Sequence, residues 1–317
     1  MKVLSKEVFN QIRRWVYLYA RPIEMAKWEY NFESGSKEAI IKVISFFQNK
    51  DGGFSGFDPD CSNPESSPWS THNGAYDMLV NLGCGDKSNP IIQGIMRYVA
   101  NTDHFTEQGW YWAVPSNNNY PCEDYMRFPN SPWFPDDWPP SKINNGNMSR
   151  FVLEHFDKED EVYKKTLRML EYRISIMPTY ADFCKYANTI EQGMEAWDWA
   201  KLINNLRDFG IKSGEEYERI ASDFLKIVES SLKDENVLNE IRYWKNNNGS
   251  EYGGNPEDID FDVIIDKLSS GNKWNDNGLL DKTRNDITSL KVGELWWPII
   301  EVIDNLNILK ENNRLEI

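Results

Sequence analysis

Apolar residues recur at intervals of three and four along most of the chain, and few stretches alternate with a period of two. This spacing predicts α-helices, because 3.6 residues per turn bring such positions onto one face. We expect about eleven helices, or twelve if one weak segment escapes notice. They are predicted at residues 4–19, 36–48, 70–83, 141–155, 158–173, 179–191, 194–208, 258–268 and 296–311, with two more beginning near Asn89 and Ser213.

Polar residues at three helix starts support these boundaries. Ser36 is a predicted N-cap, and Asn89 precedes Pro90, a residue favoured in the first helical turn. Ser213 and Glu216 have the spacing of a capping box. The segment 103–140 interrupts the helical pattern with prolines and aromatic residues, and loops of that length are usually functional.

The composition adds a surplus of flat rings and of negative charge. The chain has 13 tryptophans, and aromatic residues make up 14 % of it, more than helix packing requires. Such rings suit cationic or polyene hydrocarbons through their π electrons, and sugars through the apolar faces of the sugar rings. The net charge of −15 disfavours partners with phosphate backbones, so we expect neither nucleic acid nor an anionic lipid surface as a partner.

Nothing in the sequence predicts a membrane segment or a disulfide framework. No apolar run reaches signal-peptide or membrane-spanning length, so we expect a soluble, cytoplasmic protein. The cysteines are widely spaced and form no CxxC pair, so reduced, unpaired thiols are expected. They are Cys61, Cys84, Cys122 and Cys184.

One stretch carries a family resemblance. Residues 46–60 read FFQNKDGGFSGFDPD, and NPESSPWSTHNGAYDMLVNLG follows at 63–83. The order of glutamine, double glycine, aromatic residue, Pro-x-x-Thr and a helix ending in Leu-Gly resembles one repeat of squalene-hopene cyclases and protein prenyltransferase β subunits. The turns QGWYW (108–112) and GNKW (271–274) resemble it more weakly.

The resemblance implies an all-α protein, an α/α toroid of six helical hairpins closed around a central cavity, with residues 1–317 as one domain. It also implies that Gln48 ties down a helix end and that Phe54 packs between hairpins. Paired glycines just past a helix end agree with a structural turn, since they permit positive φ.

The chemistry of the two resembled families is missing. The cyclase Asp-x-Asp-Asp motif would fall on residues 69–72, which read Trp-Ser-Thr-His. Asp182 and Cys184 match the first half of the prenyltransferase zinc motif, but no histidine follows them. The acidic run at 257–262 is best explained as favourable charge at a helix start. We therefore expect no metal and no cofactor.

Asp58, Asp60 and His72 are the candidate catalytic residues. The two aspartates share the mutual spacing of the cyclase acids but lie earlier in the loop, and His72 is expected at the cavity end of an inner helix. A histidine held by a carboxylate is a workable acid or base. The alternative is that both aspartates cap their loop and that His72 fills a surface groove.

Four aromatic residues are the candidate substrate-binding residues. They are Trp69, Trp112, Tyr120 and Trp133. Prolines and asparagines separate Trp112, Tyr120 and Trp133. We therefore expect these three rings to project from a stiff, non-helical backbone. A lid packed on its own aromatics explains the pattern equally well.

Three functions are compatible with the sequence. The first is an enzyme of the cyclase and prenyltransferase type that acts on an isoprenoid or another extended apolar substrate, and we favour it. The second is a carbohydrate-active toroid, a glycoside hydrolase or lyase that uses paired carboxylates. The third is a toroid that binds a small apolar or sugar-like ligand without catalysis.

Overall fold

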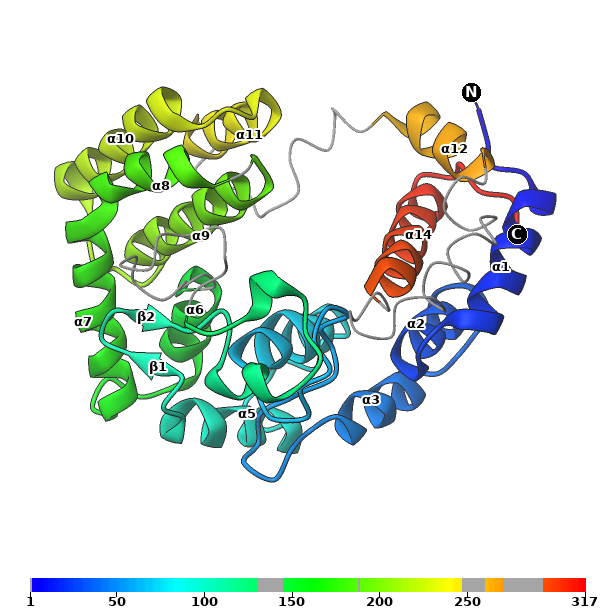
Figure 1. The fold of residues 1–317 in the computed structure, drawn as a ribbon, viewed down its shortest axis with the longest axis horizontal. Helices are drawn as coiled ribbons and strands as arrows, with labels where there is room; N and C mark the ends of the chain where they lie inside the picture. The colour runs from blue at the N-terminus through cyan, green and yellow to red at the C-terminus, as the bar shows by residue number, and fades with distance from the viewer. Residues whose placement is uncertain (1, 130–144, 188, 247–259, 271–292) are drawn as a thin grey trace.

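The computed structural model describes residues 2–129, 145–187, 189–246, 260–270 and 293–317 (Figure 1). Over these ranges the chain is mostly helical, which confirms the class predicted from the apolar spacing. The first part of the chain forms α1 (Lys6–Tyr19), α2 (Pro22–Phe32), α3 (Lys37–Phe46), η1 (Ser70–Tyr76), α4 (Asp77–Asn81) and α5 (Pro90–Asn101). Within the described residues no helix combines the length and the apolar character that crossing a bilayer requires.

The loop region after α5 holds short elements. They are β1 (Phe105–Thr106), β2 (Gly109–Trp110), η2 (Pro115–Asn119) and η3 (Asp124–Met126). The two strands pair antiparallel, with Phe105 opposite Trp110. The remaining elements are α6 (Asn145–His155), α7 (Glu161–Ile176), η4 (Met177–Thr179), α8 (Tyr180–Tyr186), α9 (Thr189–Asp208), α10 (Gly214–Ser231), α11 (Glu235–Asn246), α12 (Phe261–Ser269) and α14 (Gly293–Glu311).

The helices follow one another round an arc, and the two chain ends lie close together (Figure 1). The backbone N–H of Leu4 donates to the carbonyl of Arg314 at 2.9 Å, and the N–H of Glu316 donates to the carbonyl of Leu4 at 3.0 Å. Helix α14 packs against α1 and α2. The last helix therefore returns to the first ones.

Among the described residues, two large apolar cores stabilise the arc, and α2 contributes to both. Ile23 and Ala26 belong to a large core that extends from α2 to α11. Trp28 and Phe32, on the same helix, belong to a second core shared with α1, α12 and α14. In that second core the rings of Phe9 and Trp28 stack with centroids 5.2 Å apart. Because α2 faces both cores, it links the chain ends to the rest of the helices.

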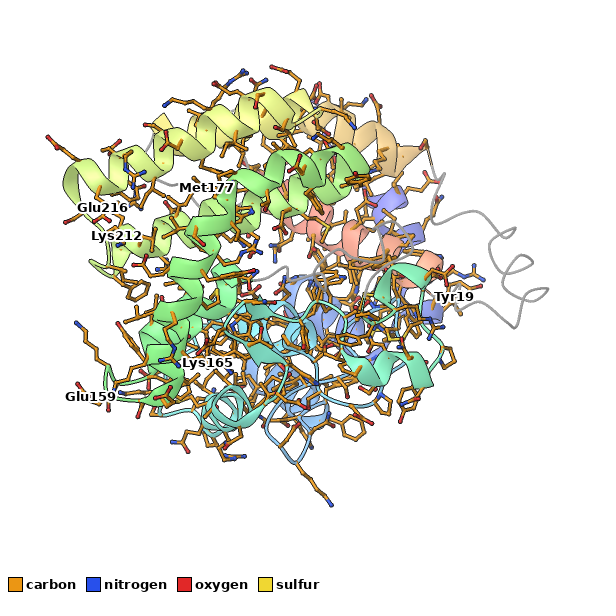
Figure 2. All side chains as sticks on the ribbon, turned by 60° about the vertical axis from the view of Figure 1, so that its left-hand side comes forward. Tyr19, Glu159, Lys165, Met177, Lys212 and Glu216 are labelled. Atoms are coloured by element: carbon orange, nitrogen blue, oxygen red, sulfur yellow. A yellow bond between two sulfur atoms is a disulfide. The ribbon has the colours of Figure 1, made fainter. Side chains whose placement is uncertain are left out.

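Side-chain ion pairs join neighbouring helices on the surface. Lys212, just before α10, contacts Glu171 of α7 at 2.9 Å and Glu216 of α10 at 3.0 Å. Figure 2 shows Lys212 and Glu216 next to each other at one end of α10. Exposed pairs of this kind each contribute little stability. The fold therefore depends mainly on the buried apolar faces.

The helix starts at Ser36, Asn89 and Ser213 are as predicted, but the capping box expected at Ser213 does not form. Ser36 accepts a hydrogen bond from the N–H of Ala39, and Asn89 accepts one from the N–H of Ile91. Ser213 is the N-cap of α10, yet its side chain makes no capping hydrogen bond. The next residue, Gly214, has a φ of +56°, in the left-handed region. This backbone conformation accompanies the missing capping hydrogen bond.

Helices α2 and α11 were not predicted from the sequence. In α2 the charged Glu24 is buried beside apolar residues such as Trp28. The buried face of this helix is therefore not a purely apolar stripe. Helix α8 ends at Tyr186 and α9 begins at Thr189, earlier than the break expected at 192–193. The turn expected at 271–274 lies outside the described residues, and so do residues 141–144 at the start of the helix predicted at 141–155.

The turn at residues 48–54 is structural, as its sequence predicts. The side-chain amide of Gln48 donates to the carbonyl of Gly52 at 3.0 Å and to that of Ile91, in α5, at 2.9 Å. Phe54 is fully buried in the large core. Gly52 has a φ of +96°, and a Cβ there would lie 1.9 Å from the carbonyl oxygen of Gly94. Only glycine suits that position, because any side chain would collide with the backbone of α5.

Candidate functional site

Asp58 and Asp60 are the buried carboxylates of one tight loop. Both residues are buried, and each has 8 % of its surface exposed. The Oδ1 atom of Asp58 accepts the backbone N–H of Asp60 at 2.8 Å, which is the local hydrogen bond typical of an aspartate in a turn. The loop is therefore held partly by the carboxylate of Asp58 itself.

Arg21 fixes the start of this loop from the N-terminal end of α2. Its guanidinium donates to the backbone carbonyls of Gly56 at 3.0 Å and Phe57 at 3.2 Å. The same group pairs with both carboxylate oxygens of Glu24, at 2.5 and 2.9 Å. The ring of Trp296 lies 4.7 Å from the guanidinium carbon. A partly buried cation thus lies near Asp58.

Two residues far away in the sequence hold the carboxylate of Asp60. The indole Nε1 of Trp297 donates to its Oδ2 at 2.6 Å, and the hydroxyl of Tyr125 donates to the same atom. Hydrogen bonds to a carboxylate are stronger than those between neutral groups. The backbone of Asp60 is held as well, since its carbonyl accepts the N–H of Glu123 at 2.9 Å.

The two carboxyl groups therefore have different environments. Burial raises the pKa of Asp58 to about 7; the negative charge of Asp60 adds to this, whereas the hydrogen bond from the Asp60 N–H and the charge of Arg21 oppose it. Burial, together with the nearby carboxylates, also raises the pKa of Tyr125, which keeps its hydroxyl proton available to Asp60. An acid with a pKa near 7 exists in both forms at neutral pH, so Asp58 can give or take a proton there.

Three tryptophans are connected by ring contacts, and one of them, Trp297, holds Asp60. The ring of Trp69 meets those of Trp112 and Trp297 nearly at right angles, with centroids 6.2 and 6.4 Å apart. All three residues keep part of their surface exposed. The rings therefore form an aromatic edge beside the buried acids, and they present apolar surface to a ligand.

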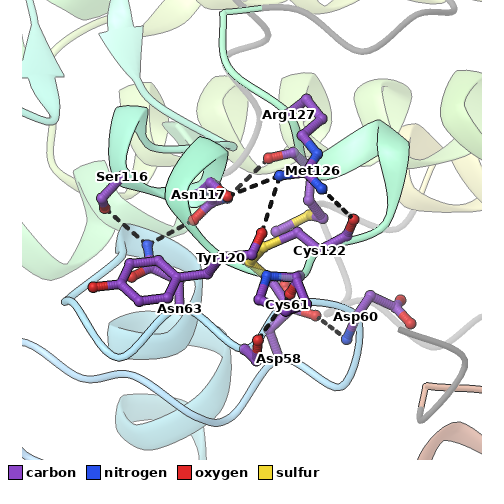
Figure 3. The surroundings of a disulfide bond; sticks show 12 residues. Asp58, Asp60, Cys61, Asn63, Ser116, Asn117, Tyr120, Cys122, Met126 and Arg127 are labelled. Atoms are coloured by element: carbon purple, nitrogen blue, oxygen red, sulfur yellow. Dashed lines mark hydrogen bonds between the residues drawn. A yellow bond between two sulfur atoms is a disulfide. The ribbon is translucent and has the colours of Figure 1, made fainter. Parts of the chain in front are cut away.

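A disulfide joins this loop to the segment that carries Tyr125 (Figure 3). Cys61 and Cys122 are bonded, so the prediction of four reduced, unpaired thiols is wrong for this pair. Cys84 and Cys184 are free. The spacing of 61 residues carries no sequence signal, because only the folded loops bring the two sulfurs together.

Hydrogen bonds surround the disulfide. The side-chain amide of Asn63 donates to the hydroxyl of Ser116 and to the side-chain oxygen of Asn117, both at 2.8 Å. Arg127 donates to the backbone carbonyls of Tyr120 at 3.0 Å and Cys122 at 3.1 Å. In Figure 3 the ring of Tyr120 and the carboxylate of Asp60 point in opposite directions. Tyr120 was predicted to bind substrate, but the ring does not face Asp60.

His72 pairs with a different carboxylate. It lies in the π-helix η1, is 5 % exposed, and its Nδ1 is 3.3 Å from Oδ1 of Asp77. It was predicted to face the cavity mouth beside Trp69, with Asp58 and Asp60 on the preceding loop as possible carboxylate partners. The carboxylate that it contacts is that of Asp77, one turn further along the same helical segment. Trp133, another predicted binding residue, lies outside the described residues.

Four predicted residues lie around one site, and the structure adds others to them. It brings together Asp58, Asp60, Trp69 and Trp112. Three further members of the site were not predicted from the sequence, and they are Arg21, Tyr125 and Trp297. In the sequence Tyr125 is only one of several aromatic residues of the long loop. No sequence signal pointed to Trp297, since it is 237 positions from Asp60.

Asp182 and Cys184, the two residues that match half of the zinc motif, are not arranged as metal ligands. Asp182 pairs with Lys185 at 2.5 Å, and Cys184 is buried, which raises the pKa of its thiol. In the part of the chain that the structure describes, no three His, Cys, Asp or Glu side chains are grouped so as to hold a metal ion. Asp260 instead caps α12, accepting the N–H groups of Asp262 and Val263.

Comparisons of the chain with protein-family models, with curated proteins and with solved structures found no match. The function is therefore inferred from the geometry and chemistry of the site around Asp58 and Asp60.

Proposed function

We propose that this protein is an enzyme in which Asp58 transfers a proton to a substrate bound against the tryptophans beside it. The observation that supports this most is the contrast between the two aspartates. Burial raises the pKa of Asp58 to about 7, whereas Asp60 accepts hydrogen bonds from Trp297 and Tyr125. Two carboxyl groups in unlike environments are the usual arrangement for an acid and its charged partner.

The proposed substrate is an isoprenoid or another extended apolar molecule. The resemblance of residues 46–83 to cyclase and prenyltransferase repeats supports this class, and so do the partly exposed rings of Trp69, Trp112 and Trp297. The proposal includes an α/α toroid whose central cavity holds the substrate. The arc of helices and the pairing of the chain ends near Leu4 are consistent with such a closed arrangement.

The cytoplasmic location expected from the sequence belongs to the same proposal. Disulfides are rare in that compartment because thiol reductants act on them, so this location requires that burial shields the Cys61–Cys122 bond, whose two residues are each 6 % exposed. Trapping thiols in intact cells, followed by mass spectrometry, measures how much of this pair is oxidised.

Solvent-proton incorporation tests the catalytic proposal. Squalene and geranylgeraniol are incubated with the full-length chain in deuterated buffer, and products are analysed by gas chromatography and mass spectrometry. A cyclised or hydrated product should carry one deuterium, and Asp58→Asn should abolish it. Asp103→Asn is the matched control, because the side chain of Asp103 is 99 % exposed. Full activity of Asp58→Asn would contradict the proposal.

A carbohydrate-active enzyme is the second candidate, and the pKa of Asp58 favours it. Protonation of an alkene carbon requires a strong acid, whereas a carboxylic acid with a pKa near 7 suits protonation of a glycosidic oxygen. In this alternative Asp60 is the second carboxylate. Release of nitrophenol from aryl glycosides, lost in both Asp58→Asn and Asp60→Asn, would favour it over the isoprenoid substrate. A ligand that binds without turnover would indicate a binding protein.

A further inference from the structure

A separate pocket lies between α2, the η1–α4 segment and α14. Its volume is about 510 Å³, within the roughly 300–1,000 Å³ of pockets that hold small ligands. Neither Asp58, Asp60 nor the tryptophans around them line it. The pocket is therefore a different site, and a ligand could bind there whether or not Asp58 transfers a proton.

The pocket is lined by both apolar and polar side chains. Ile40, Met78 and Leu82 supply apolar surface. The polar lining includes the amides of Asn73, Asn81 and Asn307. An amide side chain donates and accepts hydrogen bonds, which matches a hydroxyl group, since a hydroxyl does the same. Tyr30, also in the lining, is 39 % exposed and offers a ring face against which the apolar side of a sugar can pack.

The charges of the lining oppose an anionic ligand. Three carboxylates line the pocket, those of Asp77, Asp304 and Glu311, against the one ammonium group of Lys27. Lys27 already pairs with Asp304 at 3.0 Å. Glu311 accepts the amide of Asn307 at 2.9 Å, which orients both groups on α14. A phosphate or carboxylate ligand would be repelled, whereas hydroxyl groups would find acceptors.

Asp77 is the best-supported acceptor, and His72 lies behind it. The Nδ1 atom of His72 is buried, 3.3 Å from Asp77, and its angle satisfies no hydrogen bond among the described residues. Burial acts to raise the pKa of Asp77, but the neighbouring His72 and the charge of Lys201 together outweigh it and keep that pKa below its ordinary value. The carboxylate therefore stays ionised and able to accept hydrogen bonds from a ligand.

We propose that this pocket binds a neutral, hydroxyl-rich ligand of the sugar class, with Asp77 as the central acceptor and Asn73 and Asn307 as flanking amides. Amide side chains, an aromatic ring and apolar side chains in one lining complement a sugar, whose hydroxyl groups lie at its edges and whose C–H groups lie on its faces.

Saturation-transfer NMR on the full-length chain tests this assignment, with cellobiose, maltose, glucose and glucose 6-phosphate as probes and spermidine as a cationic competitor. At least one disaccharide should receive saturation, and glucose 6-phosphate should bind no better than glucose. Asn73→Ala and Asn307→Ala should each weaken the binding of that disaccharide about fivefold, the loss expected for one hydrogen bond. Asp77→Asn should weaken it at least as much.

Asn10→Ala is the matched control, because Asn10 is exposed on α1 and does not line the pocket. It should leave the affinity unchanged, and circular dichroism should show equal helicity for all four variants. The proposal is overturned if neither disaccharide receives saturation, if the pocket variants bind as well as Asn10→Ala, or if spermidine binds and the sugars do not.

Discussion

The indole nitrogen of Trp297 donates a 2.6 Å hydrogen bond to the carboxylate of Asp60, which precedes it by 237 residues. Tyr125 donates to the same oxygen from a third part of the chain. The site around Asp60 is thus assembled from the loop after α3, the segment after β2 and the start of α14. It forms only when the last helix has returned to the first ones.

Removal of either donor should destabilise the protein in a measurable and coupled way. Trp297→Phe and Tyr125→Phe each take one hydrogen bond from a buried carboxylate, at a cost of about 2 kcal/mol in unfolding free energy. Because both donors bind one oxygen, the double variant should differ from the sum of the single ones. Urea unfolding of the four proteins measures this coupling. Strict additivity would show that the two donors act independently.

The stability difference between Asp58→Asn and the parent protein should depend on pH. The folded pKa of about 7 lies above the unfolded value of 3.8, so the folded state binds the proton more tightly. Ionisation of Asp58 therefore costs stability as pH rises from about 4 to 7, by an amount on the order of 4 kcal/mol above pH 7. Asparagine carries no charge, and its side-chain oxygen keeps the bond from the Asp60 N–H.

We expect Asp58→Asn to melt at a higher temperature than the parent protein at pH 8 and at nearly the same temperature at pH 4. Only the difference between the two proteins is informative, because many other acids titrate in this range. Asp103→Asn should show no such pH-dependent difference. A gap in melting temperature that stays constant from pH 4 to 8 would mean that Asp58 titrates normally.

Reduction of the disulfide should lower stability through the long loop it closes. Cys61 and Cys122 are 61 residues apart, and closing a loop of that length restricts the unfolded chain by about 4 kcal/mol. The Cys61→Ser/Cys122→Ser variant should lose a comparable amount in denaturant unfolding. Cys84→Ser is the control, since that thiol is free. Thiol labelling of the unfolded, unreduced chain should count two free cysteines; a count of four would refute the bond.

Two phenylalanines near the 48–54 turn allow a matched comparison of a buried and an exposed ring. Phe54 is fully buried, and Phe54→Ala should cost about 3–5 kcal/mol and lower the melting temperature. Phe46, at the end of α3, is 85 % exposed, so Phe46→Ala should change the melting temperature little. Similar losses in the two variants would mean that Phe54 does not pack in the core.

Local patterns were sufficient for much of the fold. The spacing of apolar residues predicted most of the helices, and Ser36 and Asn89 fixed two helix starts through hydrogen bonds to residues two or three positions away. The turn from Gln48 to Phe54 was predicted for the same reason, since paired glycines and the following ring determine local geometry. Helix α2 was missed because its buried face includes Glu24, whose charge is balanced by Arg21 in the folded protein.

The sequence by itself determined the helical class, the structural turn and two of the acids of the site, because each depends on residues close together in the chain. Only the tertiary structure decided that Cys61 bonds to Cys122, that His72 pairs with Asp77, and that Trp297 holds Asp60. Long-range pairings of this kind depend on how the helices pack. The periodicity and spacing of residues along the chain do not show which distant side chains will lie within a few ångströms of each other after the helices have packed.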